Sequence, residues 1–138
     1  MSTLARLLDA VRDNAAPSAD FSAADEPLSP AQAHDLADAL SVNTALTALD
    51  LSHMDLAVEG VAALAMALQF HGALRSLTLR DTNMTDQCAL PWAAMLRGTE
   101  TLTHFDCSGN PLNDAGVEAI ASALDINMTL TSLRLADT

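Results

Sequence analysis

Three residues near position 106 have the chemical types of a catalytic relay. His104, Asp106 and Ser108 follow one another at steps of two, and a Ser–His–Asp relay activates a serine for covalent catalysis. In a strand, residues two apart share one face and lie roughly 6.5–7 Å apart. The relay needs contacts of about 3 Å, which parallel side chains on one strand do not make. We therefore predict that this spacing is coincidental and that the protein is not an enzyme.

The acidic and histidine residues do not predict a metal site either. Asp50 and Asp106 fall two strands apart, roughly 9–10 Å between backbones, whereas two oxygens on one divalent ion lie about 4–5 Å apart. His104 and Asp106 lack a third ligand, and the other histidines occupy unrelated positions. We predict no metal and no cofactor.

The chain repeats with a constant period. The pattern Leu-x-x-apolar-x-apolar starts at Leu46, Leu74, Leu102 and Leu130, each 28 positions after the one before. A fixed period of about 20–50 residues is typical of solenoids. In each unit, apolar and polar residues first alternate, as in a strand with one buried face. Apolar residues then recur every four positions, as on one stripe of a helix.

Each repeat is therefore predicted as one strand followed by one helix. Because every strand runs in the same direction, the strands stack into a parallel sheet and the helices line its other side. Helices are wider than strands, so the array should curve with the sheet on its concave side. We predict an α/β solenoid of about four and a half repeats.

The frame also extends toward the N-terminus. Ser29 and Pro30 are typical of a helix start, and a degenerate strand precedes them, in which Phe21 occupies the position of Leu49. Thr3–Asp13 is predicted as an amphipathic capping helix. The predicted domains are residues 1–17, the capping helix and its link, and residues 18–138, the repeat domain.

The repeat resembles the ribonuclease-inhibitor-like leucine-rich repeats, whose consensus Leu-x-x-Leu-x-Leu-x-x-Asn-x-Leu is followed by a full helix. The resemblance covers about residues 18–138 and implies a right-handed array that presents a surface to a protein partner. The consensus Asn, which ties neighbouring turns together, stands only at Asn110. Met54 and Thr82 replace it, so we expect less tightly laddered turns in those two repeats.

This resemblance implies a specific fold but not a specific function, because proteins with unrelated activities share the repeat. The main interpretation is a non-enzymatic protein–protein interaction module. One alternative is an activator of a small GTPase, since Ran GTPase-activating proteins share the repeat but use far more copies. Another is a fragment of a longer leucine-rich repeat effector or receptor, in which the period continues past Thr138.

Composition limits the partners. The formal net charge is −12 and all six basic residues are arginine, which argues against nucleic acid but is compatible with a basic protein partner. No apolar run reaches the roughly 18–20 residues of a membrane span, and the N-terminus lacks the pattern of a Sec-type signal. We predict buried thiols rather than a disulfide at Cys88 and Cys107. We expect a cytoplasmic protein, with secretion by a non-Sec route as the alternative.

The residues that flank the strand leucines form the predicted concave face. Those expected to contact a partner are Asp50, Ser52, Ser76, Thr78, Arg80, His104, Asp106, Ser108, Ser132 and Arg134. This face carries small, hydroxyl and charged side chains but no aromatic residue, although aromatic residues are typical of binding hot spots. A solvated sheet face without a partner is the competing interpretation.

One helix contains an irregularity. Pro91 lies within a predicted helix and removes a backbone hydrogen bond, so we expect that helix to begin late, near Leu90, after a loose Thr85–Ala89 loop. Trp92 aligns with Leu64 and is predicted to be in the core.

The last repeat has a strand but no helix after it. Leu130, Leu133 and Leu135 should point inward, yet nothing in the sequence covers them. We expect two copies to pair antiparallel through Leu130–Thr138, with the neighbouring helix Ala115–Asp125 also in contact. A fragment of a longer array and a frayed end are the alternatives.

Overall fold

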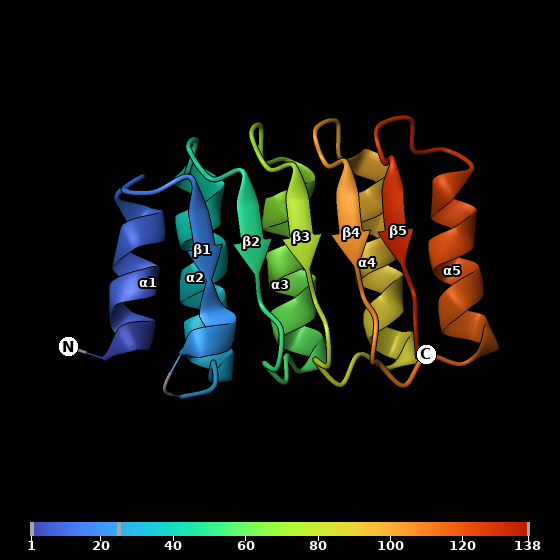
Figure 1. The fold of residues 1–138 in the computed structure, drawn as a ribbon, viewed down its shortest axis with the longest axis horizontal. Helices are drawn as coiled ribbons and strands as arrows, with labels where there is room; N and C mark the ends of the chain where they lie inside the picture. The colour runs from blue at the N-terminus through green and yellow to red at the C-terminus, as the bar shows by residue number, and fades with distance from the viewer. Residues whose placement is uncertain (1, 25, 138) are drawn as a thin grey trace.

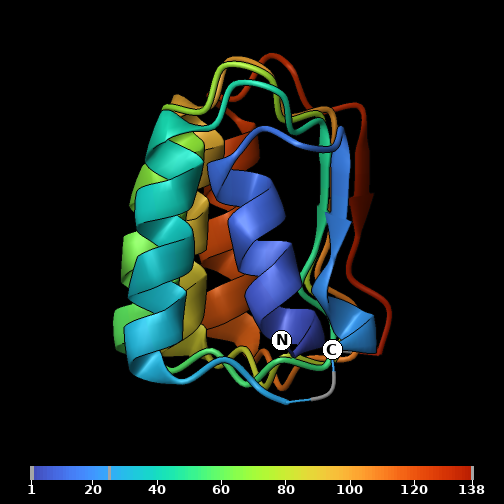
Figure 2. The ribbon, with the colours of Figure 1, turned by 90° about the vertical axis from the view of Figure 1, so that its left-hand side faces the viewer.

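The chain forms two layers, a sheet and a row of helices (Figure 1). The computed structural model describes residues 2–24 and 26–137. Viewed from the end, the α-helices lie on one side of the sheet and leave its other face open (Figure 2). In chain order the elements are α1 (Thr3–Arg12), β1 (Ser18–Asp20), the 3₁₀ helix η1 (Phe21–Ala23), α2 (Pro30–Val42), β2 (Ala48–Asp50), α3 (Val58–Gln69), β3 (Ser76–Thr78), α4 (Asp86–Gly98), β4 (His104–Asp106), α5 (Asp114–Leu124) and β5 (Ser132–Arg134).

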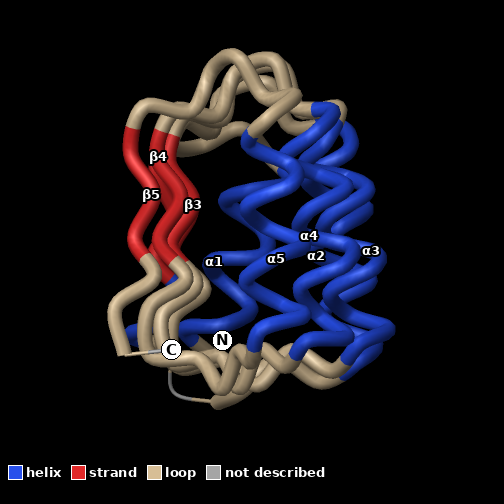
Figure 3. The backbone as a smooth tube through the Cα atoms, turned by 90° about the vertical axis from the view of Figure 1, so that its right-hand side faces the viewer, coloured by secondary structure: helices blue, strands red, loops and turns tan. Residues whose placement is uncertain are grey.

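The sheet confirms the predicted frame from β2 onward. Its strands are parallel and pair in the order β1-β2-β3-β4-β5. Leu49 pairs with Leu77, which pairs with Phe105, which pairs with Leu133, so each step across the sheet equals one period of the sequence. Seen from the C-terminal end, the strands stack one behind another and the helices do the same (Figure 3). The α/β repeat architecture is therefore as predicted.

The first strand departs from the constant period. Ala19, not Phe21, pairs with Leu49, an offset of 30 because 49 − 19 = 30. The connection from β1 to α2 spans residues 21–29, two more than residues 51–57 between β2 and α3. Phe21 begins η1 and is completely buried, so its ring enters the core from just beyond the strand. The prediction placed Phe21 in the strand because a buried aromatic residue fits the pattern from either position.

The core lies between the two layers and contains the leucines of the repeat. Trp92 is 1% exposed, as predicted. Cys88 and Cys107 are buried free thiols. Burial, and to a smaller extent the nearby Asp106 carboxylate, raises the pKa of Cys107 to about 12. This thiol therefore stays protonated at neutral pH and behaves as a small apolar core residue.

The prediction for the Pro91 helix is wrong. Helix α4 begins at Asp86, not near Leu90, and contains Pro91 in its second turn. The first turn still closes, because the Ala89 N–H donates to the Thr85 carbonyl at 3.0 Å. Cys88 and Trp92 are both buried against the core, so tertiary packing keeps the helix in frame despite the lost hydrogen bond.

One polar position in each repeat closes the turn from helix to strand. Asn43, His71, Thr99 and Asn127 occupy equivalent positions in successive repeats. Each side chain accepts hydrogen bonds from the backbone N–H groups two and three residues further along the chain, with donor–acceptor distances of 2.7–3.3 Å. A buried N–H without a partner costs about 1–3 kcal/mol, so these caps stabilise the turns that precede β2, β3, β4 and β5. These positions are 28 residues apart, but they carry different residue types, so the sequence alone did not indicate a shared role.

His71 performs this role as a neutral imidazole. Its Nδ1 atom accepts from the N–H groups of Ala73 and Leu74, so the proton lies on Nε2. Nε2 lies 3.0 Å from Asn43 Oδ1, to which it donates. Burial lowers the pKa of His71, and the cationic form would also lose both Nδ1 hydrogen bonds.

This arrangement predicts that the protein is less stable in mild acid. The folded pKa lies below the ordinary value of 6.5, so the unfolded chain binds this proton first as the pH falls. We expect the free energy of unfolding to fall as the pH drops below about 6.5. His71→Asn keeps an acceptor of the type present at positions 43 and 127, and should remove this component. Urea unfolding at a series of pH values measures it.

The matched control is His34→Asn, on the exposed surface of α2, which should retain the wild-type pH dependence. An unchanged pH dependence in His71→Asn would show that the buried imidazole does not cause the effect.

Candidate functional site

The sheet register lays out two rows of side chains on the concave face. Strand pairing aligns Ser76, His104 and Ser132 in one row and Asp50, Thr78, Asp106 and Arg134 in the next. His104 and Arg134 are exposed, and the others are half-buried. These residues lie together on one face, and their role in binding remains a prediction.

Ser52 and Ser108 do not belong to the open part of this face. They are only 4% and 1% exposed, so the expectation that they face solvent is wrong. Each hydroxyl accepts a backbone N–H from the following repeat, from Arg80 at 3.2 Å and from Ala136 at 3.1 Å. These serines extend the ladder beyond the strand ends, where the chain turns inward toward the helices.

The Asp-x-Ser pairs that include these serines close turns. Asp50 Oδ1 accepts from the Ser52 N–H at 2.8 Å, and Asp106 Oδ1 accepts from the Ser108 N–H at 3.0 Å. Asp20 accepts from the Ser22 N–H in the same way. An aspartate that accepts from a backbone N–H two residues on is a recognised turn motif, and its recurrence at three strand ends was available from the sequence.

The residues of the hypothetical relay form other contacts. His104 Nδ1 lies 2.8 Å from Thr103 Oγ1. Asp106 accepts from Ser108 N and from Arg80, while the Ser108 hydroxyl accepts from Ala136 N. The geometry thus gives each residue a role in the sheet or its turns.

An ion pair joins two repeats on this face. Arg80 Nη1 lies 3.2 Å from Asp106 Oδ2, with the two side chains 48% and 17% exposed. Burial raises the pKa of Asp106, but hydrogen bonds from Ser108 and Arg80 and the guanidinium charge outweigh it and lower the pKa overall. Arg134 pairs in register with Asp106 on the other side. The Asp106 carboxylate therefore has Arg134 beside it in the row, and the Arg80 guanidinium reaches it from just beyond the end of β3.

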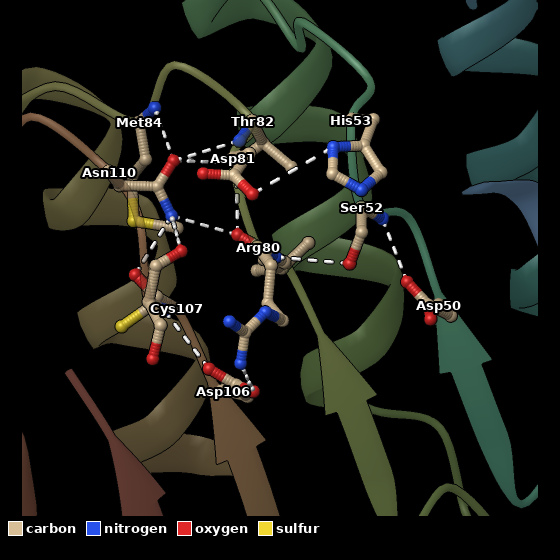
Figure 4. Close-up of polar contacts among 12 residues, drawn as sticks. Asp50, Ser52, His53, Arg80, Asp81, Thr82, Met84, Asp106, Cys107 and Asn110 are labelled. Carbon is tan, nitrogen blue, oxygen red and sulfur yellow. Dashed lines mark hydrogen bonds and ion pairs between the residues drawn. The ribbon is translucent and has the colours of Figure 1, made fainter. Parts of the chain in front are cut away.

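Asn110 ties the turn after β4 to the turn after β3 (Figure 4). Its Nδ2 donates to the carbonyls of Leu79 and Cys107, both at 2.8 Å. Its Oδ1 accepts from the N–H groups of Thr82 at 2.9 Å and Met84 at 3.0 Å. Asn110 is 1% exposed, so these bonds satisfy buried backbone groups of both repeats.

The other two positions of this column are bonded differently. The Thr82 hydroxyl lies 3.3 Å from the Leu79 carbonyl of its own turn and 3.2 Å from Asn110 Oδ1 of the next repeat. The turn that contains Met54 keeps the backbone bond that recurs in these turns. The His53 N–H donates to the Arg80 carbonyl at 2.9 Å, as the Asp81 N–H does to the Ser108 carbonyl at 3.1 Å.

The same turns require a left-handed backbone at one position. His53, Asp81, Gly109 and Asp137 stand at this position in successive repeats and have φ values of 66°, 53°, 74° and 59°. A Cβ at Gly109 would also overlap the Asp81 carboxylate. His53 Nδ1 lies 3.8 Å from Asp81 Oδ2, but both side chains are largely exposed, so this pair contributes little.

The leucines of the last repeat are less covered than their counterparts. Leu130, Leu133 and Leu135 are half-buried. Their equivalents two repeats earlier, Leu74, Leu77 and Leu79, are 2%, 0% and 0% exposed. Thr138, the final residue of the proposed dimer edge, lies outside the described residues.

A groove that was not predicted from the sequence lies on the helix side. It lies between α2 and α3, has a volume of about 540 Å³, and is lined in part by Asp38, Met66 and Phe70. Met66 and Phe70 are 67% and 79% exposed. The sequence did contain a sign of this groove, because large apolar residues stand at helix positions that the repeat pattern directs toward solvent.

The part of the chain that the structure describes contains neither a metal-binding cluster nor a membrane-spanning helix. Within residues 2–24 and 26–137, no three His, Cys, Asp or Glu side chains are grouped to hold a metal ion. None of the helices in those ranges has the length and apolar character needed to cross a membrane.

Comparison with known proteins identifies the repeat. A family model described as Leucine Rich repeat matches residues 42–65 and 100–121. The chain is 37% identical over 90 residues to NACHT, LRR and PYD domains-containing protein 13 of Homo sapiens, which covers 65% of this chain and 9% of that protein. It is 35% identical over 68 residues to leiomodin-1 of Rattus norvegicus, covering 49% of this chain and 11% of that protein. The chain thus spans about a tenth of these relatives.

Solved structures share the whole fold. The leiomodin-1 actin-binding site 2 superposes with a TM-score of 0.84 at 20% identity, covering 98% of this chain and 80% of that one. The tropomodulin C-terminal domain of Caenorhabditis elegans gives a TM-score of 0.80 at 11% identity, covering 98% and 83%. At these identities the likeness concerns the fold alone.

The Asn110 network predicts a large stability effect. Asn110→Ala would leave buried backbone groups of two turns unpaired, so we expect the free energy of unfolding to fall by about 2–4 kcal/mol. Urea unfolding measures the change. The control is Asn113→Ala, an exposed helix N-cap without a side-chain hydrogen bond to that helix, which should lose less than about 0.5 kcal/mol. Similar losses in both variants would contradict this role.

Proposed function

Because this chain is a leucine-rich repeat protein, with repeats consistent with the ribonuclease-inhibitor-like subfamily, we propose that it is a non-enzymatic protein-interaction module. Its concave face contacts a protein partner. The repeat scaffold supports a binding role, since stacked strands of this kind present an extended surface for recognition. Two buried free thiols suit a reducing compartment, and we propose a cytoplasmic location.

A cluster of charged side chains from β4, β5 and the turn after β3 is the observation that carries this proposal. Strand register places Asp106 beside Arg134, and an ion pair holds the Arg80 side chain against Asp106. Arginine is enriched at interfaces because its planar guanidinium offers several donors in a fixed geometry. His104 is exposed on the same strand as Asp106. Together they form a rigid polar strip that a partner can match.

The concave face is small, which limits how the partner binds. Five strands about 4.8 Å apart make a sheet roughly 20–25 Å wide, and its exposed area is a few hundred Å². A standard interface buries about 800 Å² on each partner. We therefore propose that the partner also contacts the loops at the strand ends. The net charge of −12 would attract a basic partner from a distance.

Two alternative functions have separate support. Activation of a small GTPase rests only on the shared repeat, and would appear as faster GTP hydrolysis that is lost when Asp106 or Arg134 is replaced. A role within a longer effector or receptor draws support from the relatives, of which this chain spans about a tenth. One solved structure with this fold is an actin-binding site of leiomodin-1, which makes actin a specific partner to test.

We also propose that two copies of the 138-residue chain associate at β5. The support is the partial exposure of Leu130 and Leu133 in the terminal strand's repeat, whose equivalents in the interior repeats are buried. A second copy would cover these leucines and join two sheets at an edge strand. A further repeat of a longer array would cover the same surface.

The concave-face proposal predicts selective loss of a partner. His104→Glu with Arg134→Glu should abolish capture of proteins that wild type retains, because both exposed side chains would change the charge of the strip. The readout is quantitative mass spectrometry of affinity-purified complexes, with co-sedimentation on actin filaments as one defined arm. Glu118→Arg on the exposed surface of α5 is the control and should retain the partner. Partners lost only in the control would place binding on the helices instead.

The dimer proposal predicts a mass of twice 14.4 kDa by light scattering at micromolar concentration. Leu133→Asp should shift the protein toward a single chain, because a carboxylate would be buried at the shared edge. Ala31→Asp, at an exposed position of α2 far from β5, is the control, because it adds the same charge outside the proposed interface. A wild-type mass of one chain would overturn the proposal.

A further inference from the structure

Helices α2 and α3, whose side chains line the groove, lie on the opposite side of the molecule from the concave face of the sheet (Figure 2). It runs between the C-terminal halves of α2 and α3, and its volume of about 540 Å³ falls within the range of roughly 300–1,000 Å³ typical of ligand-binding clefts. Ala37, Ala63 and Ala67 line it, and their short side chains leave the space open. Met66 and Phe70 stand at its side and are mostly exposed.

The next pair of helices shows how such a surface can be covered. Between α3 and α4, the Gln69 side chain lies directly against Gly98, where an added Cβ would overlap its amide. A polar group thus covers that contact. In the α2–α3 groove, by contrast, a methionine and a phenylalanine remain 67% and 79% exposed. Clustered exposed side chains of this kind are typical of interaction sites.

The electrostatics of the groove favour a cationic partner. Both α2 and α3 end beside it, and the C-terminal end of a helix carries partial negative charge. Neither helix has a basic residue in its last turn, whereas the last turn of α4 contains Arg97. The titratable groups that line the groove are Asp38, His34 and the buried His71, and no arginine is among the lining residues.

We infer that this groove binds a basic amphipathic helix of a partner protein. Apolar side chains of that helix, spaced by three or four residues, enter the groove and pack on Met66 and Phe70. Its lysine or arginine side chains lie against Asp38 and the ends of α2 and α3. An anionic membrane or a nucleic acid would meet a chain of net charge −12, which opposes both occupants. This second surface shares no residue with the concave face and stands independently of the function proposed for it.

A displayed library of random peptides tests the inference without assuming a partner. The peptides should be about 14 residues long, similar in length to α2 and α3. Selection against wild type should enrich sequences with apolar residues at helical spacing and with flanking lysine or arginine. Fluorescence anisotropy then measures the selected peptides. Met66→Ser with Phe70→Ser should weaken binding at least about tenfold, and Asp38→Asn should weaken it and reduce its dependence on salt.

Matched controls separate this site from other apolar patches. Met128→Ser with Leu90→Ser removes two side chains that are 96% and 60% exposed away from the groove, and should change affinity by less than about twofold. The concave-face variant His104→Glu with Arg134→Glu should also bind normally. Enriched peptides that are acidic, or that bind the Met66 and Phe70 variant as well as wild type, would overturn the inference. Failure to enrich any peptide that needs Phe70 would do the same.

Discussion

The structure depends on one requirement, that every repeat return to the sheet in the same register. Parallel strands of three residues each supply few hydrogen bonds themselves, so the turns at both ends must also be satisfied. Asn43, His71, Thr99 and Asn127 cap one set of turns, and Asn110 links two turns at the other end. Most of these side chains are buried, where an unpaired backbone group is costly. The buried polar side chains of the protein therefore act mainly as hydrogen-bond partners of backbone groups in the turns.

This requirement accounts for residues whose types suggest chemistry. Asp106 and Ser108 could belong to a catalytic relay, but their oxygens accept backbone N–H groups that shape the end of β4. His71 could be a general base or a ligand, but both ring nitrogens are occupied in a turn. Side chains already bound to the backbone in this way are held in place rather than available to a substrate.

The two layers offer surfaces of different character for a simple geometric reason. Strand side chains alternate between the faces of the sheet, so the concave face carries polar residues in straight rows set by register. Helices present a broader outer surface, and the outward-facing residues near their C-terminal ends differ in type from one repeat to the next. The concave face therefore offers a rigid polar strip, whereas the helix layer offers an apolar groove with a negative rim.

The sequence by itself determined the repeat, the strand-and-helix order and the identity of the core leucines, because a constant period admits only one way to stack. It also indicated Asn110 through the consensus. Tertiary structure alone decided the offset of β1, since two extra residues in a loop leave the apolar pattern intact. It kept α4 helical through Pro91, because core contacts of Cys88 and Trp92 outweigh a local preference. The tertiary structure also buries Ser52 and Ser108 and forms the groove between α2 and α3. Burial and grooves arise from contacts between segments that are distant in the sequence, so no single stretch of sequence predicts them.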